Sequence, residues 1–223
     1  MFLCCIFNSA LLWTAIGSVA TGVMAIATFI TIIQNRKQGR EFFRQNFENT
    51  LFSLIKEFKD ARTRIKYNED ISGYDALLQG WEHFRMQVSV ENYNPSSIID
   101  KPLRFRSPEE LSSKEFVLIN YFLVMNNNFC DLNGYYQSLV CILNFIDNSN
   151  HNVTSKKKYI GWVENNLSEL ELKLLFYTCA FDEHKKKLRF FVEKWGLLHN
   201  LAKVKLIHSV HATWLSPDAF KNK

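Results

Sequence analysis

The first 35 residues contain no Asp, Glu, Lys or Arg, and the first charged side chain is Arg36. The most apolar part, from about residue 10 to residue 33, exceeds the ~20 residues that cross a bilayer core as a helix. No basic residue precedes it, unlike in a signal peptide, and a buried core helix is usually shorter. The sequence therefore predicts a membrane anchor over residues 1–35, with one transmembrane helix and a short apolar stub over residues 1–8.

Basic residues after this stretch predict its orientation. Four of them follow within ten residues, namely Arg36, Lys37, Arg40 and Arg44. Positive charge is enriched on the cytoplasmic side of membrane helices, so we expect the N-terminus outside and the rest of the chain in the cytoplasm. Five cysteines without a CxxC spacing agree with a reducing compartment.

Beyond the anchor, apolar residues recur at steps of three and four, which is typical of helices. We predict a juxtamembrane amphipathic helix over residues 36–67, either a core helix or a dimerising stalk, and a cytosolic helical domain over 68–223. After a turn at 68–73, helices are expected near 74–88, 112–146, 156–166, 172–181, 183–195 and 197–214. An Asn run at 126–128 marks the expected interruption of the second of these. No strand pattern stands out, so the predicted fold class is all-α.

No catalytic, metal or cofactor site is predicted, because no phosphate-binding loop, dinucleotide turn or nucleophile elbow occurs. His208 and His211 are three residues apart, but zinc needs further ligands, so a solvated or capping role is expected. Glu171 is expected to cap a helix that begins after Ser168, with Lys173 solvated. Lys194 and His199 come nearest to the Arg-x₄₋₆-His signature of helical ribonucleases, but the arginine is missing. We expect neither an enzyme nor a small-molecule substrate.

The net charge of +5 is concentrated late in the chain, where residues 182–205 hold seven basic and three acidic side chains. Such a patch can contact the phosphates of nucleic acid or of anionic lipid, although a solvated face is an equally good interpretation. The candidate contact residues are Lys156, Lys157, Lys158, Lys185, Lys186, Lys187 and Arg189.

Small residues at steps of four line one face of the predicted membrane helix: Ala10, Thr14, Ser18 and Gly22. Such faces let helices approach closely in lipid, which predicts a homo-oligomer. The alternative is that the face reflects only the general abundance of small residues in membrane helices.

Several motifs resemble those of the phage abortive infection (AbiC-like) family. They are the segments 134–147 (GYYQSLVCILNFID), 167–177 (LSELELKLLFY), 47–54 (FENTLFSL) and 197–201 (LLHNL). The sequence departs from the family pattern at Thr178, where Asn is usual, and at residues 164–166, where Arg-Ala-Gln is usual. Family members also often carry two N-terminal spans.

The resemblance implies an anti-phage defence protein of the bacterial inner membrane. Some members are effectors of retron systems, so it further implies membrane damage after release by a regulatory partner such as a reverse transcriptase with its nucleic-acid product. A membrane-tethered nuclease or ribonuclease toxin and a non-toxic membrane adaptor remain as alternatives.

Overall fold

The computed structural model describes residues 2–68, 70–88, 113–201 and 205–221, and for residues 2–20, 126 and 127 it describes the backbone alone. Contacts divide the chain into two compact units, Met1–Thr50 and Leu51–Lys223. The boundary falls inside the helix expected over residues 36–67.

In the part of the chain that the structure describes, no helix is both long enough and apolar enough to cross a membrane. The side chains of residues 10–20, where the predicted span begins, lie outside the described residues.

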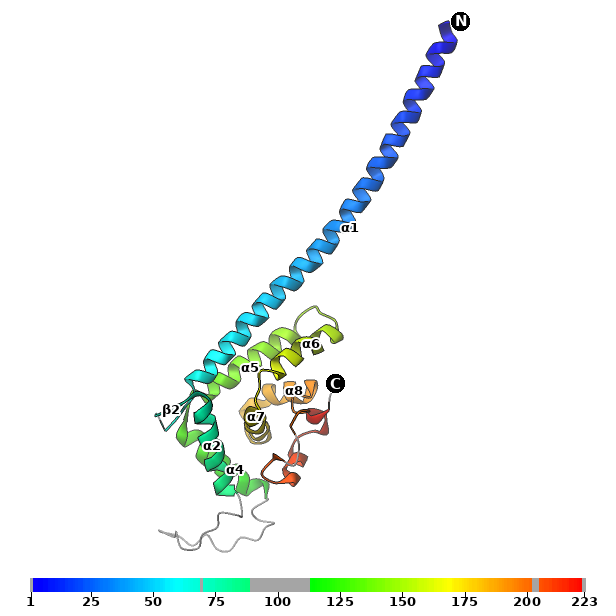
Figure 1. Ribbon diagram of the computed structural model, residues 1–223. Coiled ribbons are helices and arrows are strands. Elements are labelled where there is room, and N and C mark those ends of the chain that lie inside the picture. Colours follow the sequence, from blue (N-terminus) through cyan, green and yellow to red (C-terminus); the bar gives the residue numbers. More distant parts are fainter. Residues whose placement is uncertain (1, 69, 89–112, 202–204, 222–223) are drawn as a thin grey trace, which may run out of the picture. The chain divides into compact units, whose positions relative to one another are not determined.

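The first helix, α1, runs from Phe2 to Arg64 without a break (Figure 1). Most described side chains from residue 21 to residue 50 are exposed, and a buried face begins at Leu51. It continues through Ile55, Phe58 and Ala61 at helical spacing. The core-helix interpretation therefore fits the end of α1. Phe43, which lies at the same spacing nearer the N-terminus, is exposed instead of belonging to this face.

The described residues of the second unit hold six further α-helices, which confirms the all-α prediction. They are α2 (Gly73–Val88), α4 (Lys114–Asn128), α5 (Leu132–Asp147), α6 (Val153–Glu164), α7 (Glu169–Phe181) and α8 (Lys186–Trp195). α6 begins three residues before its predicted start, because Asn152 accepts a hydrogen bond from the Ser155 backbone N–H and caps it.

Three short strands were not predicted: β1 (Lys66–Tyr67), β2 (Ile71–Ser72) and β3 (Phe129–Cys130). They form an antiparallel sheet in the order β2-β1-β3. Asn68, at positive φ, lies in the β1–β2 turn, and its N–H donates to the Asn128 carbonyl. Gly73, also at positive φ, leads from β2 into α2. Strands of two residues are too short to leave an alternating pattern.

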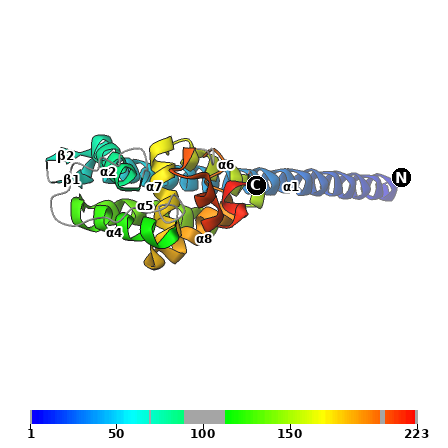
Figure 2. The same ribbon diagram turned by 90° about the horizontal axis from the view of Figure 1, so that it is seen from below.

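The core surrounds α7, in which every side chain from Leu170 to Phe181 except Lys173 is buried. Figures 1 and 2 show α2 and α4 side by side, with α7 packed against both. Tyr177 lies at the centre, with its ring 5.1 Å from that of Phe84 and 5.8 Å from that of Trp81. A helix hydrophobic all round is typical of the middle of a domain, and α7 takes that place here.

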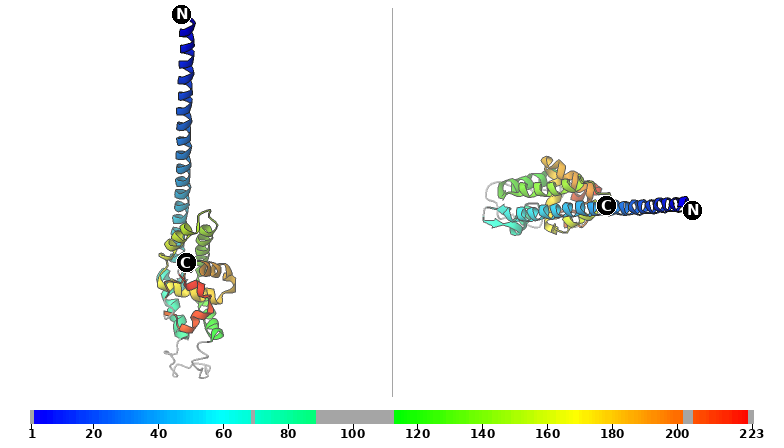
Figure 3. Two further views of the ribbon diagram at one scale, coloured as in Figure 1. Left: turned by 90° about the vertical axis from the view of Figure 1, so that its right-hand side faces the viewer. Right: turned by 90° about the horizontal axis from the view of Figure 1, so that it is seen from above.

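The last predicted helix, over residues 197–214, is wrong. The described part of this segment forms the 3₁₀ turn η4 (Ser209–Trp214), followed by η5 (Pro217–Phe220). Gly196, at φ +69°, ends α8 as expected, and the chain folds back so that η5 packs against α8 (Figure 3). Pro217 at the start of η5 fits a tight turn better than the interior of a long helix.

Candidate functional site

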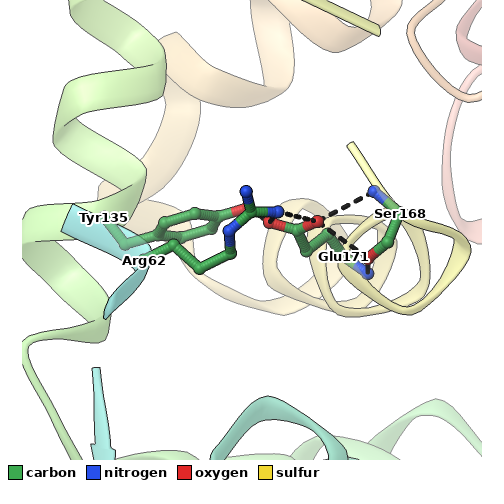
Figure 4. Close-up of polar contacts among 4 residues, drawn as sticks. All are labelled: Arg62, Tyr135, Ser168 and Glu171. Carbon is green, nitrogen blue, oxygen red and sulfur yellow. Dashed lines mark hydrogen bonds and ion pairs between the residues drawn. The ribbon is translucent and has the colours of Figure 1, made fainter. Parts of the chain in front are cut away.

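The most elaborate polar site of the second unit is centred on Glu171, on the first turn of α7 (Figure 4). Glu171 is only 2 % exposed, so its carboxylate needs hydrogen-bond donors from the protein. Its sequence neighbour Ser168 supplies two of them, as the predicted capping box requires. The Ser168 backbone N–H and hydroxyl donate to Glu171 Oε2 at 2.8 and 2.7 Å.

Two donors reach the same carboxylate from distant parts of the chain. The Tyr135 hydroxyl, on α5, donates to Glu171 Oε1 at 2.6 Å. The Arg62 guanidinium, near the end of α1, donates to Glu171 Oε2 at 3.1 Å and forms an ion pair with it. We call Arg62, Tyr135, Ser168 and Glu171 the Glu171 cluster. It joins the end of α1 to α5 and α7.

Burial and charge explain the chemistry of the cluster. Burial, followed by the adjacent negative charge of Glu171, raises the pKa of Tyr135 well above its usual range, so the hydroxyl keeps its proton and remains a donor. The four side chains therefore hydrogen-bond to one another, and this arrangement holds the end of α1, α5 and α7 together.

Two other buried polar groups accompany α7. The Thr178 hydroxyl lies 2.8 Å from that of Tyr121 and 2.9 Å from that of Tyr136. Thr178 thus satisfies two tyrosines that burial would otherwise leave without partners, and burial raises the pKa of both. Thr178, at the position where the resemblance leads us to expect Asn, therefore still places a polar side chain between the two tyrosines.

The prediction of a solvated or capping role for His208 and His211 is wrong for His211. His208 is exposed, but His211 is fully buried, stacked on Trp214 with ring centroids 4.0 Å apart. Its Nδ1 lies 2.7 Å from the Tyr177 hydroxyl. The same hydroxyl accepts a hydrogen bond from the Ile207 N–H at 3.2 Å, so Tyr177 links His211 to the backbone of the last segment. Burial, with a smaller contribution from His208, lowers the pKa of His211 to about 4.

Lys173 was also expected to be solvated and is instead largely covered. Its ammonium pairs with Glu169 at 2.8 Å and lies 5.6 Å from the centre of the Trp81 ring. Within the described residues, no group of three His, Cys, Asp or Glu side chains is arranged to hold a metal ion.

The predicted basic contacts divide into exposed and engaged side chains. Lys157, Lys186 and Lys187 are exposed. Lys156 donates to the Asp147 carbonyl at 2.6 Å, at the end of α5, and Lys185 donates to Asn133. Arg189 pairs with Glu193 at 3.0 Å, one turn along α8.

The two basic groups line separate pockets. Lys157 and Lys158 belong to a pocket of about 300 Å³ with Glu164, Trp195 and His199. Lys186 and Arg189 belong to a pocket of about 320 Å³, which also has Lys114, Cys179, Asp182 and Glu183 in its walls. Sequence reasoning found the lysines but missed Glu164, because nothing in its spacing marks it as the partner of His199.

The other predicted site residues lie on α1. The side chains of Ala10, Thr14 and Ser18 are outside the described residues, and Gly22 is exposed with open space around its Cα. Arg36, Lys37, Arg40 and Arg44 are all exposed, as their predicted role in topology requires.

Comparison with known proteins gives one match. The model of the family described as "Putative phage abortive infection protein" matches residues 127–206. No curated protein and no solved structure shows significant similarity to the chain. The matched region includes three of the four motifs that carry the predicted resemblance, together with Tyr135, Ser168 and Glu171 of the Glu171 cluster. The match confirms the predicted resemblance to the AbiC-like family of phage abortive infection proteins over residues 127–206.

Proposed function

We propose that this protein is a membrane-anchored effector of abortive infection, which damages the inner membrane of an infected bacterium. The family match is the observation that carries the proposal, because the matched family is described by its link to phage abortive infection. The sequence of residues 1–35 supports the anchor, since a charge-free stretch of this length followed by four basic residues is typical of a membrane segment.

The Glu171 cluster supports a transmission role for the helical unit. It ties Arg62, on the helix that begins in the proposed anchor, to the family-matched region through Tyr135 and Glu171. Elements joined by a buried polar cluster tend to move together, because separating them leaves a buried carboxylate without its donors. A change in the helical unit would thus reach α1.

We further propose that a cytosolic regulatory complex holds the effector inactive, and that a reverse transcriptase with its nucleic-acid product is such a partner. Lys186 and Lys187 are the most suitable phosphate contacts, because both are exposed, whereas Lys185 and Arg189 already have partners. Their replacement by Glu should weaken co-purification of the partner in a salt-dependent manner.

The decisive experiment compares two double variants of α1 in phage-infected cells. Ser18→Leu with Gly22→Leu changes the small-residue face, and Val19→Leu with Val23→Leu adds bulk beside it. We expect the first pair to insert normally but to lose self-association, membrane depolarisation and phage protection. The second pair should retain all three.

Equal protection and equal depolarisation in both double variants would show that α1 serves only as an anchor. A reporter fused after Lys223 tests the orientation, and it should be active only as a cytosolic fusion. Protection that persists while the membrane potential stays intact would favour the nuclease toxin or the adaptor instead.

A further inference from the structure

The pocket beside Lys157 lies between α6 and the end of α8, outside the Glu171 cluster. Its walls include Lys157, Lys158, Gly161, Glu164, Trp195 and His199, and its volume is about 300 Å³. This is the lower end of the range of small-ligand sites, so it suits a compact molecule.

The two lysines give the pocket an excess of positive charge. Neither Lys157 nor Lys158 takes part in the ion pairs described within the second unit. The Lys158 ammonium lies over the Trp162 ring, 5.1 Å from its centre. Two lysines in the wall of one pocket favour a phosphate group, which offers several strong acceptors.

The acidic member of the pocket is already held by a histidine. Glu164 Oε1 lies 3.4 Å from His199 Nδ1, and burial raises the pKa of Glu164 while His199 lowers it. His199 Nδ1 also lies 3.2 Å from the Gly196 carbonyl, which can only accept, so Nδ1 carries a proton. Two lysines and one glutamate in its walls leave the pocket with an excess of basic side chains, and the carboxylate oxygens of Glu164 can accept a hydrogen bond from a polar ligand.

Trp195 supplies a planar apolar wall. The residue is largely buried, and among the described residues its indole N–H meets no acceptor. Buried donors without a partner are rare, and a flat aromatic side chain is a common surface for a planar ring. The pocket thus combines a phosphate-binding side with a side suited to a polar aromatic ring.

The pocket that contains Lys186 is a weaker candidate for a phosphate-binding site. Its lysines and arginine face Asp182 and Glu183, and Arg189 is engaged by Glu193. Its charges are therefore nearly balanced.

We propose that the pocket between α6 and α8 binds a mononucleotide, with its phosphate on Lys157 and Lys158 and its base against Trp195 and the Glu164–His199 pair. This departs from the sequence-based expectation that the protein takes no small molecule. Occupancy has a route to α1, because Trp162, the ring beneath Lys158, stacks on Phe52 at 5.1 Å. A regulatory role through this route would rest on the proposed function, whereas binding itself does not.

Calorimetric titration of the purified full-length protein tests the binding. The ligands are AMP, GMP, CMP and UMP, each compared with its nucleoside, with inorganic phosphate and with glycerol phosphate as a lipid-headgroup analogue. We expect at least one mononucleotide to bind at least tenfold more tightly than its nucleoside and than glycerol phosphate, and inorganic phosphate to compete with it.

Matched variants locate the site. Lys157→Ala with Lys158→Ala should weaken binding at least tenfold, whereas Lys59→Ala, at an exposed lysine on α1 outside both pockets, should leave it unchanged. If the double variant fails to fold, competition by phosphate in the unaltered protein decides. Absence of binding at millimolar mononucleotide, equal affinity for nucleoside and nucleotide, or an equal loss in Lys59→Ala would overturn the proposal. Glycerol phosphate binding as tightly as every mononucleotide would overturn it too and assign the pocket to phosphate alone.

Discussion

Glu171 and His211 are both buried polar side chains, but the protein accommodates them in opposite ways. Glu171 is surrounded by donors from three elements, including a cation. His211 has one polar partner for Nδ1, and in the described part of the chain its Nε2 has none. Glu171 is thus held by several donors, whereas burial favours the neutral form of His211 and lowers its pKa.

The first prediction concerns Glu171→Gln. The amide keeps the shape but cannot accept from all the donors that the carboxylate serves, so the free energy of unfolding should fall by about 1–3 kcal/mol. Chemical denaturation of the whole protein measures this. Glu169→Gln is the matched control, because Glu169 pairs with Lys173 and Lys205 at the exposed surface and should cost less than about 1 kcal/mol. Equal losses in the two variants would contradict the central role of the Glu171 cluster.

The second prediction concerns pH. The pKa of His211 is about 4 in the folded protein and about 6.5 in the unfolded chain, so the unfolded chain binds the proton more readily. Stability from this residue is therefore complete above pH 6.5 and is lost as the pH falls to 4, by up to about 3 kcal/mol. Denaturation midpoints across this range should drop less steeply in His211→Phe than in the unaltered protein. The exposed His208→Gln should keep nearly the original slope, and an unchanged slope in His211→Phe would refute the assignment.

At the scale of the element, two helical glycines have opposite surroundings. Gly80, in α2, faces the Phe129 ring so closely that a Cβ would overlap it, while Gly134, in α5, has open space around it. Because Gly80 has no side chain, the Phe129 ring of β3 can lie directly against α2, which holds the short sheet next to this helix. Glycine is thus required in one helix and is only tolerated in the other.

The third prediction follows from this contrast. Gly80→Ala should destabilise the protein by about 1–3 kcal/mol, because Phe129 must move. Gly134→Ala should stabilise it by about 0.5–1 kcal/mol, because alanine restricts the unfolded chain and favours the helix. Thermal unfolding of the two variants gives the sign directly. A loss of stability in Gly134→Ala as large as that in Gly80→Ala would contradict the described packing.

The sequence is most informative where an element has a strong local signal. The capping box at Ser168 and Glu171 and the helix end at Gly196 both depend on residues close in the chain, and both are confirmed. By contrast, the partners of Glu171 at Arg62 and of Glu164 at His199 are 109 and 35 positions away, and only the folded chain brings them together. His211 was misjudged for the same reason, since the Tyr177 hydroxyl that accompanies its burial is 34 positions away.

At the scale of the whole molecule, the boundary between the units coincides with the start of burial along α1. From residue 21 to residue 50 no described side chain is buried, whereas Leu51, Ile55, Phe58 and Ala61 belong to the core of the second unit. The end of α1 is therefore part of the domain fold and not a linker.

The fourth prediction tests this with two truncations. Removal of residues 1–50 should leave a folded helical domain whose unfolding midpoint changes by only a few degrees. Removal of residues 1–65 takes away the buried face of α1 and Arg62, and it should abolish cooperative unfolding, because each large core side chain contributes about 2–5 kcal/mol. Circular dichroism during heating distinguishes the two. Cooperative unfolding of the shorter fragment would show that the end of α1 is dispensable.

The Glu171 cluster also has an evolutionary consequence. The Glu171 carboxylate accepts hydrogen bonds from Arg62, Tyr135 and Ser168. A change at any of these four positions therefore leaves a polar group without a hydrogen-bond partner. Substitutions at these four positions therefore depend on one another, whereas the exposed lysines of α6 and α8 can be replaced one at a time. Among relatives of this chain, the four residues should be inherited together or replaced together by an apolar set, and mixed combinations should be rare.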